Sequence, residues 1–314
     1  METLKDFYLL DELKNCAFCP RTCHVNRFEN NKTYCQSGVL CNIASVCLHY
    51  GEEPVISGEK GICNVFFTKC NLQCIYCQNY QISNRYNNLY GENYTLDQVM
   101  NLIIPFLNDG CNMLGFVSPS HYALQVKTIV EALNEKEYYP VVVYNTNSYD
   151  NIETLKLLEN IVDVYLADFK YSDANLAFEL SDARSYPDVA LKAIKEMYRQ
   201  KGNALHLNDR EEATSGIIIR HLVLPGFIDN TINVLKIIAE EISPNITLSL
   251  MSQYNPMNKK YKYDSLNRKL LNEEYNKVVK ISQELGFHKG WIQQLDSSSS
   301  YIPDFKKDKP FISF

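Results

Sequence analysis

Three cysteines lie close together in the first third of the chain: Cys70, Cys74 and Cys77, spaced C-x3-C-x2-C. Iron-sulfur clusters usually take four thiolates, so three close cysteines with no fourth nearby indicate a cuboidal cluster with one open iron. An open iron can bind a substrate or a cofactor. Two other interpretations are a structural zinc site completed by a distant residue and three ordinary buried cysteines. Zinc ligands commonly come in two C-x2-4-C pairs, and the second pair is missing downstream.

Cysteine is frequent for a chain with no signal-peptide pattern: 11 residues, ten of them between Cys16 and Cys77. Such crowding favours metal ligation over disulfides in an intracellular protein. Four of the cysteines follow C-x2-C-x3-C-x11-C, which can close around one metal as a zinc site or an auxiliary iron-sulfur cluster. These candidate ligands of a second metal site are Cys16, Cys19, Cys23 and Cys35, with Cys41, Cys47, His24 and His49 as alternates. The remaining Cys63 and Cys111 are interpreted as small buried hydrophobes.

From residue 61 onward, β-branched or aromatic runs alternate with amphipathic helical patterns. Strands are predicted at 62–68, 113–118, 140–145, 162–168, 216–223, 246–251 and 290–295, and helices at 95–109, 121–135, 151–160, 187–201, 229–242 and 271–286. This order requires a parallel sheet with helices outside, because each parallel strand needs a crossover connection. Six or seven units fall short of the eight in a full TIM barrel. The predicted fold class is therefore α/β, an incomplete (β/α)6-7 TIM-like barrel, preferred over a doubly wound sheet.

Residues 1–60 lack this alternation and are predicted to form a separate cysteine-rich module. The partial barrel is expected to span 61–295. A tail at 296–314, which begins with serines at 297–300, is expected to be a linker or a loosely docked end.

Polar residues stand at several predicted strand ends. Asp168 and Lys170 alternate at the end of the fourth strand, so both point to one side and are predicted to line a pocket rather than form a purely structural ion pair. Arg220 and His221 are adjacent within a strand, so only one of them can face that pocket. Strand-end amides that bind a ligand or cap a helix are Asn145, Asn147 and Gln253.

The formal net charge is -6 at pH 7, which argues against a broad phosphate-binding surface. This balance disfavours a nucleic-acid partner, including RNA as the substrate of a modifying enzyme. No apolar run is long enough to span a bilayer, so no membrane association is expected. We predict a soluble, cytoplasmic protein.

On these residues the sequence resembles the radical S-adenosylmethionine (SAM) superfamily, whose signature is C-x3-C-x-aromatic-C, with Tyr76 as the aromatic residue. Over nearly all of its length it resembles poorly characterised homologues of the pyruvate formate-lyase activating enzyme. The stretches that carry this resemblance, besides the triad, are 16–23, 52–54, 77–80, 118–122, 168–171, 220–226 and 251–254.

The resemblance implies that a 4Fe-4S cluster on Cys70, Cys74 and Cys77 binds SAM through its open iron. One electron, from a donor such as flavodoxin or ferredoxin, then cleaves SAM to a 5'-deoxyadenosyl radical that removes a hydrogen atom from substrate. The substrate is unknown; a protein or peptide is one candidate, and a glycyl-radical activase is the narrowest form of this function. The alternative is a non-catalytic iron-sulfur or zinc protein that transfers electrons without consuming SAM.

The resemblance also assigns candidate SAM contacts. The superfamily carries a Gly-Gly-Glu-like stretch after the second strand, where this chain has Ser118-Pro119-Ser120-His121 instead. Ser118 and Ser120 are candidate contacts of SAM through hydroxyl oxygens that can accept hydrogen bonds, and Asp168 and Lys170 are candidate contacts through their charged groups. His121 either starts a helix or faces substrate, and Tyr76 is expected near the adenine.

Overall fold

A ten-stranded sheet is the framework of the computed structural model, which describes residues 6–29, 33–86, 91–257, 259–295, 302–307 and 309–311. Its strands in the described ranges are β1 (Cys41–His49), β2 (Ile62–Phe67), β3 (Glu92–Tyr94), β4 (Met113–Val117), β5 (Val141–Thr146), β6 (Val164–Asp168), β7 (His206–Leu207), β8 (Ala213–Leu222), β9 (Thr247–Met251) and β10 (Gly290–Ile292). Their order is β10-β9-β8-β6-β5-β4-β2-β1-β3, and β7 pairs with β8.

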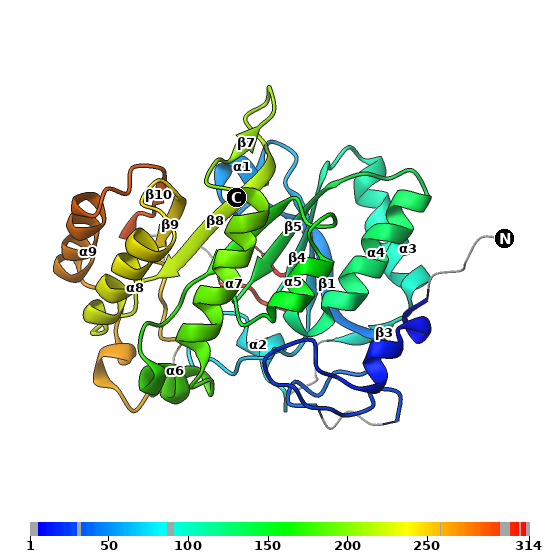
Figure 1. Cartoon of the computed structure of the whole chain (residues 1–314), viewed down its shortest axis with the longest axis horizontal. Coiled ribbons are helices and arrows are strands. Elements are labelled where there is room, and N and C mark those ends of the chain that lie inside the picture. Colours follow the sequence, from blue (N-terminus) through cyan, green and yellow to red (C-terminus); the bar gives the residue numbers. More distant parts are fainter. Residues whose placement is uncertain are drawn as a thin grey trace.

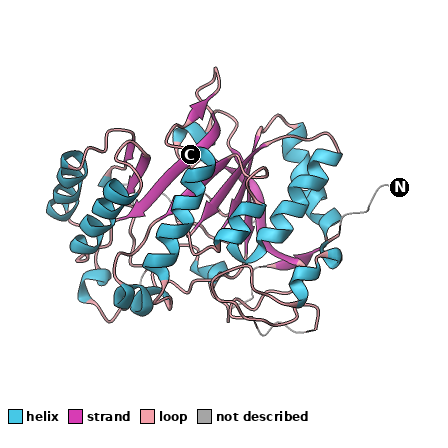
Figure 2. Cartoon of the chain, in the orientation of Figure 1, coloured by secondary structure: helices cyan, strands magenta, loops and turns pink. Residues whose placement is uncertain are grey.

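The strands from β2 to β10 along this order are parallel, as the strand-helix alternation predicts. The helices in the described ranges are α1 (Pro54–Ser57), α2 (Tyr80–Ser83), α3 (Leu96–Asn108), α4 (Ala123–Glu135), α5 (Ile152–Leu157), α6 (Ala174–Ser181), α7 (Tyr186–Lys201), α8 (Ile228–Glu241) and α9 (Asn272–Glu284). The longer helices follow the parallel strands and cover one face of the sheet (Figures 1 and 2), whereas the short α1 packs against the inner face through Ile56. Short 3-10 turns span Phe7–Leu9, Asp11–Lys14, Pro119–Tyr122 and Asp264–Asn267. None of the helices in the described ranges is long and apolar enough to cross a membrane.

Each strand and helix predicted beyond residue 61 is present, with ends that move by a few residues. A capping box begins α3: the Thr95 side chain accepts from the Gln98 backbone N–H, and the Gln98 side chain accepts from the Thr95 N–H. The fold class is confirmed as a largely parallel α/β sheet of the open-barrel type. In the described chain β10 and β3 stand at opposite ends of the strand order, so the barrel does not close.

Strand β1 was not predicted. It lies inside the expected N-terminal module, yet it pairs antiparallel with both β2 and β3 in the main sheet. Its two cysteines, Cys41 and Cys47, interrupt the apolar pattern with residues that could bind metal. Cys41 is fully buried, and Cys47 packs against the cluster that contains Phe66 of β2. The division of the chain at residue 60 stays a prediction.

Alternation along the strands separates two faces of the sheet. Residues such as Cys63, Val65 and Phe67 of β2 pack toward the helices in the main core. The inner face has an apolar layer, to which Ile62 belongs, followed by a polar layer that contains Asn64. The barrel interior is therefore apolar near the amino ends of the strands and polar toward their carboxyl ends.

The described part of the C-terminal tail packs against the sheet. Phe305 and Phe311 lie 5.5 and 5.2 Å, centroid to centroid, from the ring of Phe66. The backbone N–H of Phe305 donates to Gln81 Oε1 at 2.8 Å. The serines at 297–300 lie outside the described residues.

We predict that Gly115→Ala lowers the free energy of unfolding by about 1–3 kcal/mol. A Cβ at Gly115 would meet Asn64 Oδ1 at 1.9 Å, and Asn64 is buried where it donates to Glu52 Oε1. Urea unfolding of single and double variants measures the cost. Most of it should disappear in an Asn64→Ala background, because the atom nearest to the new Cβ is then gone and the next one, Ile62 Cδ1 at 2.9 Å, is the end of a flexible side chain. An undiminished cost there would place the strain elsewhere.

Candidate active site

A cavity of about 400 Å³ lies at the carboxyl ends of the parallel strands. Its lining comes from loops and strand ends that are far apart in the sequence. The predicted site residues that border it are Cys70, Cys74, Tyr76, Cys77, Ser118, Asn145, Asn147, Asp168, Lys170, Arg220 and Gln253. The sheet thus brings most of the candidate residues to one place.

The loop after β2 that carries the three thiols is held on both sides. Lys69 has a left-handed backbone (φ 65°) that turns the chain, and its N–H donates to Ile82 O at 2.6 Å. Further along, the N–H groups of Gln73 and Ile75 donate to the last turn of α6. These backbone contacts fix the loop at the cavity wall.

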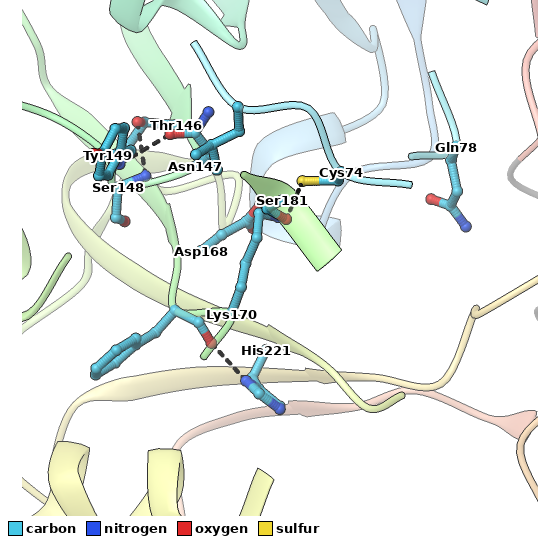
Figure 3. A network of polar contacts seen from close by, with 12 residues as sticks. Cys74, Gln78, Thr146, Asn147, Ser148, Tyr149, Asp168, Lys170, Ser181 and His221 are labelled. Atoms are coloured by element: carbon cyan, nitrogen blue, oxygen red, sulfur yellow. Dashed lines mark hydrogen bonds and ion pairs between the residues drawn. The ribbon is translucent and has the colours of Figure 1, made fainter. Parts of the chain in front are cut away.

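Each thiol receives a hydrogen bond from a neighbouring polar group. Asn147 Nδ2 donates to Cys70 Sγ at 3.4 Å. Ser181 Oγ donates to Cys74 Sγ at 2.9 Å, as Figure 3 shows. Ser83 Oγ donates to Cys77 Sγ at 3.2 Å. Donors aimed at sulfur stabilise a thiolate, the form that binds metal.

Burial raises the pKa of Cys70 to about 12 and that of Cys74 to about 11. Both thiols therefore keep their protons at neutral pH until a metal centre displaces them. Among the described residues that line the cavity, the triad supplies all of the thiols. No three His, Cys, Asp or Glu side chains in the described ranges are placed to share a single metal ion. This donor set fits a cluster with one open iron, whose thiolates each bind a different iron, better than a zinc ion.

The side chains of Asp168, at the end of β6, and Lys170, two residues further along, lie on the same side of the chain, as alternation predicts and Figure 3 shows. Both residues border the cavity. Lys170 Nζ lies 2.5 Å from Asp168 Oδ2, and each side chain is 20% exposed. Burial opposes the charge on Lys170, but Asp168 and Cys74 hold its pKa above its usual range. The pair therefore places a fixed cation and anion beside the thiols.

Of the residues that follow β4, Ser118 lies at the cavity, whereas Ser120 and His121 lie in the core. Ser118 has a left-handed backbone (φ 54°) and borders the cavity. Ser120 is buried behind the cavity wall, where its hydroxyl lies 3.1 Å from Thr146 Oγ1. His121 is also buried, and its Nε2 lies 2.9 Å from Thr68 O. Burial lowers the pKa of His121 to about 3, so the imidazole is neutral.

Tyr76 borders the cavity and its hydroxyl lies 2.6 Å from that of Tyr171. The ring is buried, so it forms a fixed wall next to the thiol loop. Gln253, from the end of β9, donates to Gln78 Oε1 at 3.1 Å and closes the opposite wall.

Arg220 and His221 point to opposite sides of β8, as predicted. Arg220 enters the cavity, where its guanidinium contacts the carboxylates of Glu52 and Glu53. His221 faces α8 instead, with Nδ1 2.6 Å from Phe169 O (Figure 3). The two glutamates border the cavity but were not predicted as site residues. Their only sequence signal is the Glu52-Glu53-Pro54 stretch.

Arg27 contacts two of the four N-terminal cysteines, and the thiol of a third, Cys23, accepts from the Tyr34 N–H at 3.2 Å. Arg27 Nε lies 3.2 Å from Cys16 Sγ, and its Nη2 lies 3.9 Å from Cys35 Sγ. Burial raises the pKa of Cys16, and the charges of Cys35 and Cys23 add to this rise. Cys19 is close enough to Cys35 to be affected in the same way. Of the alternates, His24 contacts Asn15, whereas His49 borders the main cavity.

This N-terminal segment contacts the thiol loop directly. Arg21 lies over the rings of Tyr34 and Tyr149, and its Nε donates to Asn71 O at 2.9 Å. Asn71 follows the first cysteine of the triad. The segment and the loop are therefore one packed unit (Figure 1, blue and cyan).

The family model "Radical SAM superfamily" matches residues 64–236. An uncharacterised protein of Methanocaldococcus jannaschii is 31% identical over 86% of this chain and 75% of its own length. Streptococcus suis SuiB, solved with its precursor peptide SuiA, superposes with a TM-score of 0.50 at 14% identity. That match covers 76% of this chain and half of SuiB, and it concerns the fold alone.

A domain of the pyruvate-formate lyase-activating enzyme from Bacteroides vulgatus matches at 14% identity, over 55% of this chain and 93% of that domain, with a TM-score of 0.38. The family model and the relative from Methanocaldococcus jannaschii show that the chain belongs to the radical SAM superfamily. Membership implies an enzyme that uses an iron-sulfur cluster and SAM.

We predict that Asp168→Asn weakens SAM binding about tenfold, or by about 1.4 kcal/mol, without unfolding the protein. The substitution leaves Lys170 without its anion and changes the charge of the cavity wall. Equilibrium binding of SAM to the cluster-loaded protein, with circular dichroism of the same samples, measures both effects. Glu153→Gln is the matched control, because Glu153 pairs with Lys156 on an exposed helix surface. Equal affinity in both variants would assign Asp168 to structure rather than to the pocket.

Proposed function

We propose that this protein reductively cleaves SAM at a 4Fe-4S cluster held by Cys70, Cys74 and Cys77, and then abstracts a hydrogen atom from a substrate. The observation that carries the proposal is the convergence of these three thiols on one cavity with Asp168 and Lys170. When bound, the cluster and SAM supply the electron transfer and the 5'-deoxyadenosyl radical. The chain must position SAM, stabilise the thiolates and exclude water.

Particular residues support these tasks. Asn147, Ser181 and Ser83 hold the thiolates through hydrogen bonds to sulfur. Charged and polar groups for the amino and carboxylate ends of SAM come from Lys170, Asp168 and Ser118, which border the same cavity. Tyr76 offers the adenine an aromatic wall. Ser120 is left out of this proposal, because its hydroxyl is engaged with Thr146 outside the cavity lining.

The substrate and the electron donor belong to the proposal as well. A flavodoxin or ferredoxin is the proposed donor. A glycyl-radical activase, the narrowest form, would act on a glycine of another protein. SuiB was solved with a precursor peptide, which makes a peptide a reasonable substrate to test.

We also propose that Cys16, Cys19, Cys23 and Cys35 bind a second metal centre, either zinc or an auxiliary cluster. No three of these thiols in the described chain are placed around a single ion, so an auxiliary cluster, whose thiolates each bind a different iron, is favoured over zinc. The mutual influence of these thiols on their pKa values supports this, because it requires the sulfurs to lie close together. Arg27 would then offset the negative charge of a tetrathiolate centre.

Cys70→Ala, Cys74→Ala and Cys77→Ala should each abolish formation of 5'-deoxyadenosine from SAM by the anaerobically reconstituted, reduced protein. Each removes one cluster ligand, and the open iron is then lost or misplaced. Chromatography of the products measures the loss. Cys111→Ala is the control, because Cys111 is a buried cysteine outside the triad whose thiol contacts the backbone oxygens of Gly61 and Met113. Unchanged SAM cleavage in any of the three variants would show that the triad does not hold the catalytic cluster. Metal binding by the wild type without SAM cleavage would favour a non-catalytic electron-transfer protein.

Cys19→Ser should lower the bound zinc, or the iron in excess of one cluster, and make the segment that precedes β1 sensitive to protease, whereas β1 stays protected by its pairing in the main sheet. A segment this short has little core of its own, so a metal would supply much of its stability. Metal analysis and limited proteolysis measure the two effects, and the spectrum of the Cys70 cluster should persist. Cys47→Ser, in a cysteine of β1, should change neither. Full metal content with an intact N-terminus in Cys19→Ser would show that the four cysteines are ordinary thiols.

A further inference from the structure

Two buried carboxylates share one guanidinium on the inner face of the barrel. Arg220 Nε donates to Glu53 Oε1 at 2.9 Å, and Arg220 Nη2 contacts both Glu52 and Glu53. The side chains of Arg220, Glu52 and Glu53 are only 8%, 10% and 6% exposed. One positive charge against two negative charges leaves one negative charge in excess. An uncompensated charge away from water is costly, so the group is poised for a positive partner.

In the part of the chain that the structure describes, the groups around this pair do not offset its charge. Glu52 accepts hydrogen bonds from Asn64 Nδ2 at 3.1 Å and Asn145 Nδ2 at 3.5 Å, and these amides are neutral. Burial alone would raise the pKa of Glu52, but Arg220 overrides it and lowers this pKa to about 2. The pKa of His49 is lowered by burial, so its imidazole is neutral at pH 7.

His49 is a second, independent sign of a missing partner. Its side chain borders the cavity and is 7% exposed, yet its Nδ1 has no hydrogen-bond partner among the described residues. The ring lies 4.2 Å, centroid to centroid, from that of Phe311, and Phe66 and Trp291 line the same region. Buried ring nitrogens normally have a partner, so this one points to a ligand.

The acid pair and the thiols share one cavity. Asn147 donates to Cys70 Sγ, and Asn145, two residues earlier on the same face of β5, contacts Glu52. Two residues of a strand rise about 7 Å. A small molecule held at the glutamates therefore lies within reach of the end of the cavity where the thiols stand.

We propose that Glu52, Glu53, Arg220 and His49 form the substrate subsite and that it binds a positively charged organic group, a primary ammonium or a guanidinium, of the molecule that donates the hydrogen atom. This inference rests on the proposed function and names its substrate class. An anionic ligand would add to the excess negative charge and displace a carboxylate from Arg220. A metal cation is disfavoured, because no three His, Cys, Asp or Glu side chains of the described chain are placed around a common point.

The experiment measures binding of n-butylammonium, n-butylguanidinium, butyrate and 1-butanol to the cluster-loaded protein by calorimetry at pH 7. The two cations should bind, and the anion and the alcohol should not. Glu52→Gln and Glu53→Gln should each weaken cation binding at least tenfold, while the melting temperature stays the same or rises. Each variant leaves Arg220 with a single carboxylate and so removes the excess charge. Glu59→Gln, at an exposed position next to α1, should behave like the wild type.

Absence of cation binding, or equal binding of all four probes, would overturn the inference. So would a lower melting temperature with unchanged cation affinity in the glutamine variants, since the acid pair would then be a structural ion pair. SAM cleavage is measured on the same preparation without probe. Cleavage without cation binding defeats this inference alone, and cation binding without cleavage defeats the proposed function alone.

Discussion

Parallel pairing is the constraint on which the rest of the structure depends. Strands that run the same way end at the same edge of the sheet, and each must be reached by a crossover connection. The loops after β2, β4, β5 and β6 therefore meet at that edge, although they are separated by tens of residues. The three thiols, Ser118, Asn147 and Lys170 come together for this reason. A cofactor that contacts several loops at once can bind at such an edge.

Charge balance organises the cavity in two layers. At the carboxyl edge, the Asp168–Lys170 pair and the donors to sulfur prepare the wall for three thiolates. Nearer the amino ends of the strands, Arg220 contacts Glu52 and Glu53 in a lower layer. This lower layer lies next to the apolar layer of the inner face, to which Ile56 contributes. Burial makes each unpaired charge expensive, so the two layers determine which charged groups can occupy the cavity. We propose that SAM binds at the upper layer and a cationic substrate at the lower layer.

Local patterns were sufficient to predict the barrel and much of the upper layer. Alternation within a strand placed Asp168 with Lys170 and separated Arg220 from His221, because those relations depend only on backbone geometry. The lower layer could not be predicted in this way. Glu52 reaches Arg220 across 168 positions of sequence through the packing of α1 under the barrel. Strand β1 was missed since its cysteines look like ligands, and Ser120 turned inward because the Ser118 backbone is left-handed.

We propose that the iron left open by Cys70, Cys74 and Cys77 binds SAM. The most direct test is the electron paramagnetic resonance spectrum of the reduced, cluster-loaded protein, recorded with and without SAM. The account predicts the signal of a reduced 4Fe-4S cluster whose g values shift when SAM is added, because SAM then ligates the open iron. A cluster signal that is identical in the two samples, at a SAM concentration that saturates binding, would contradict it.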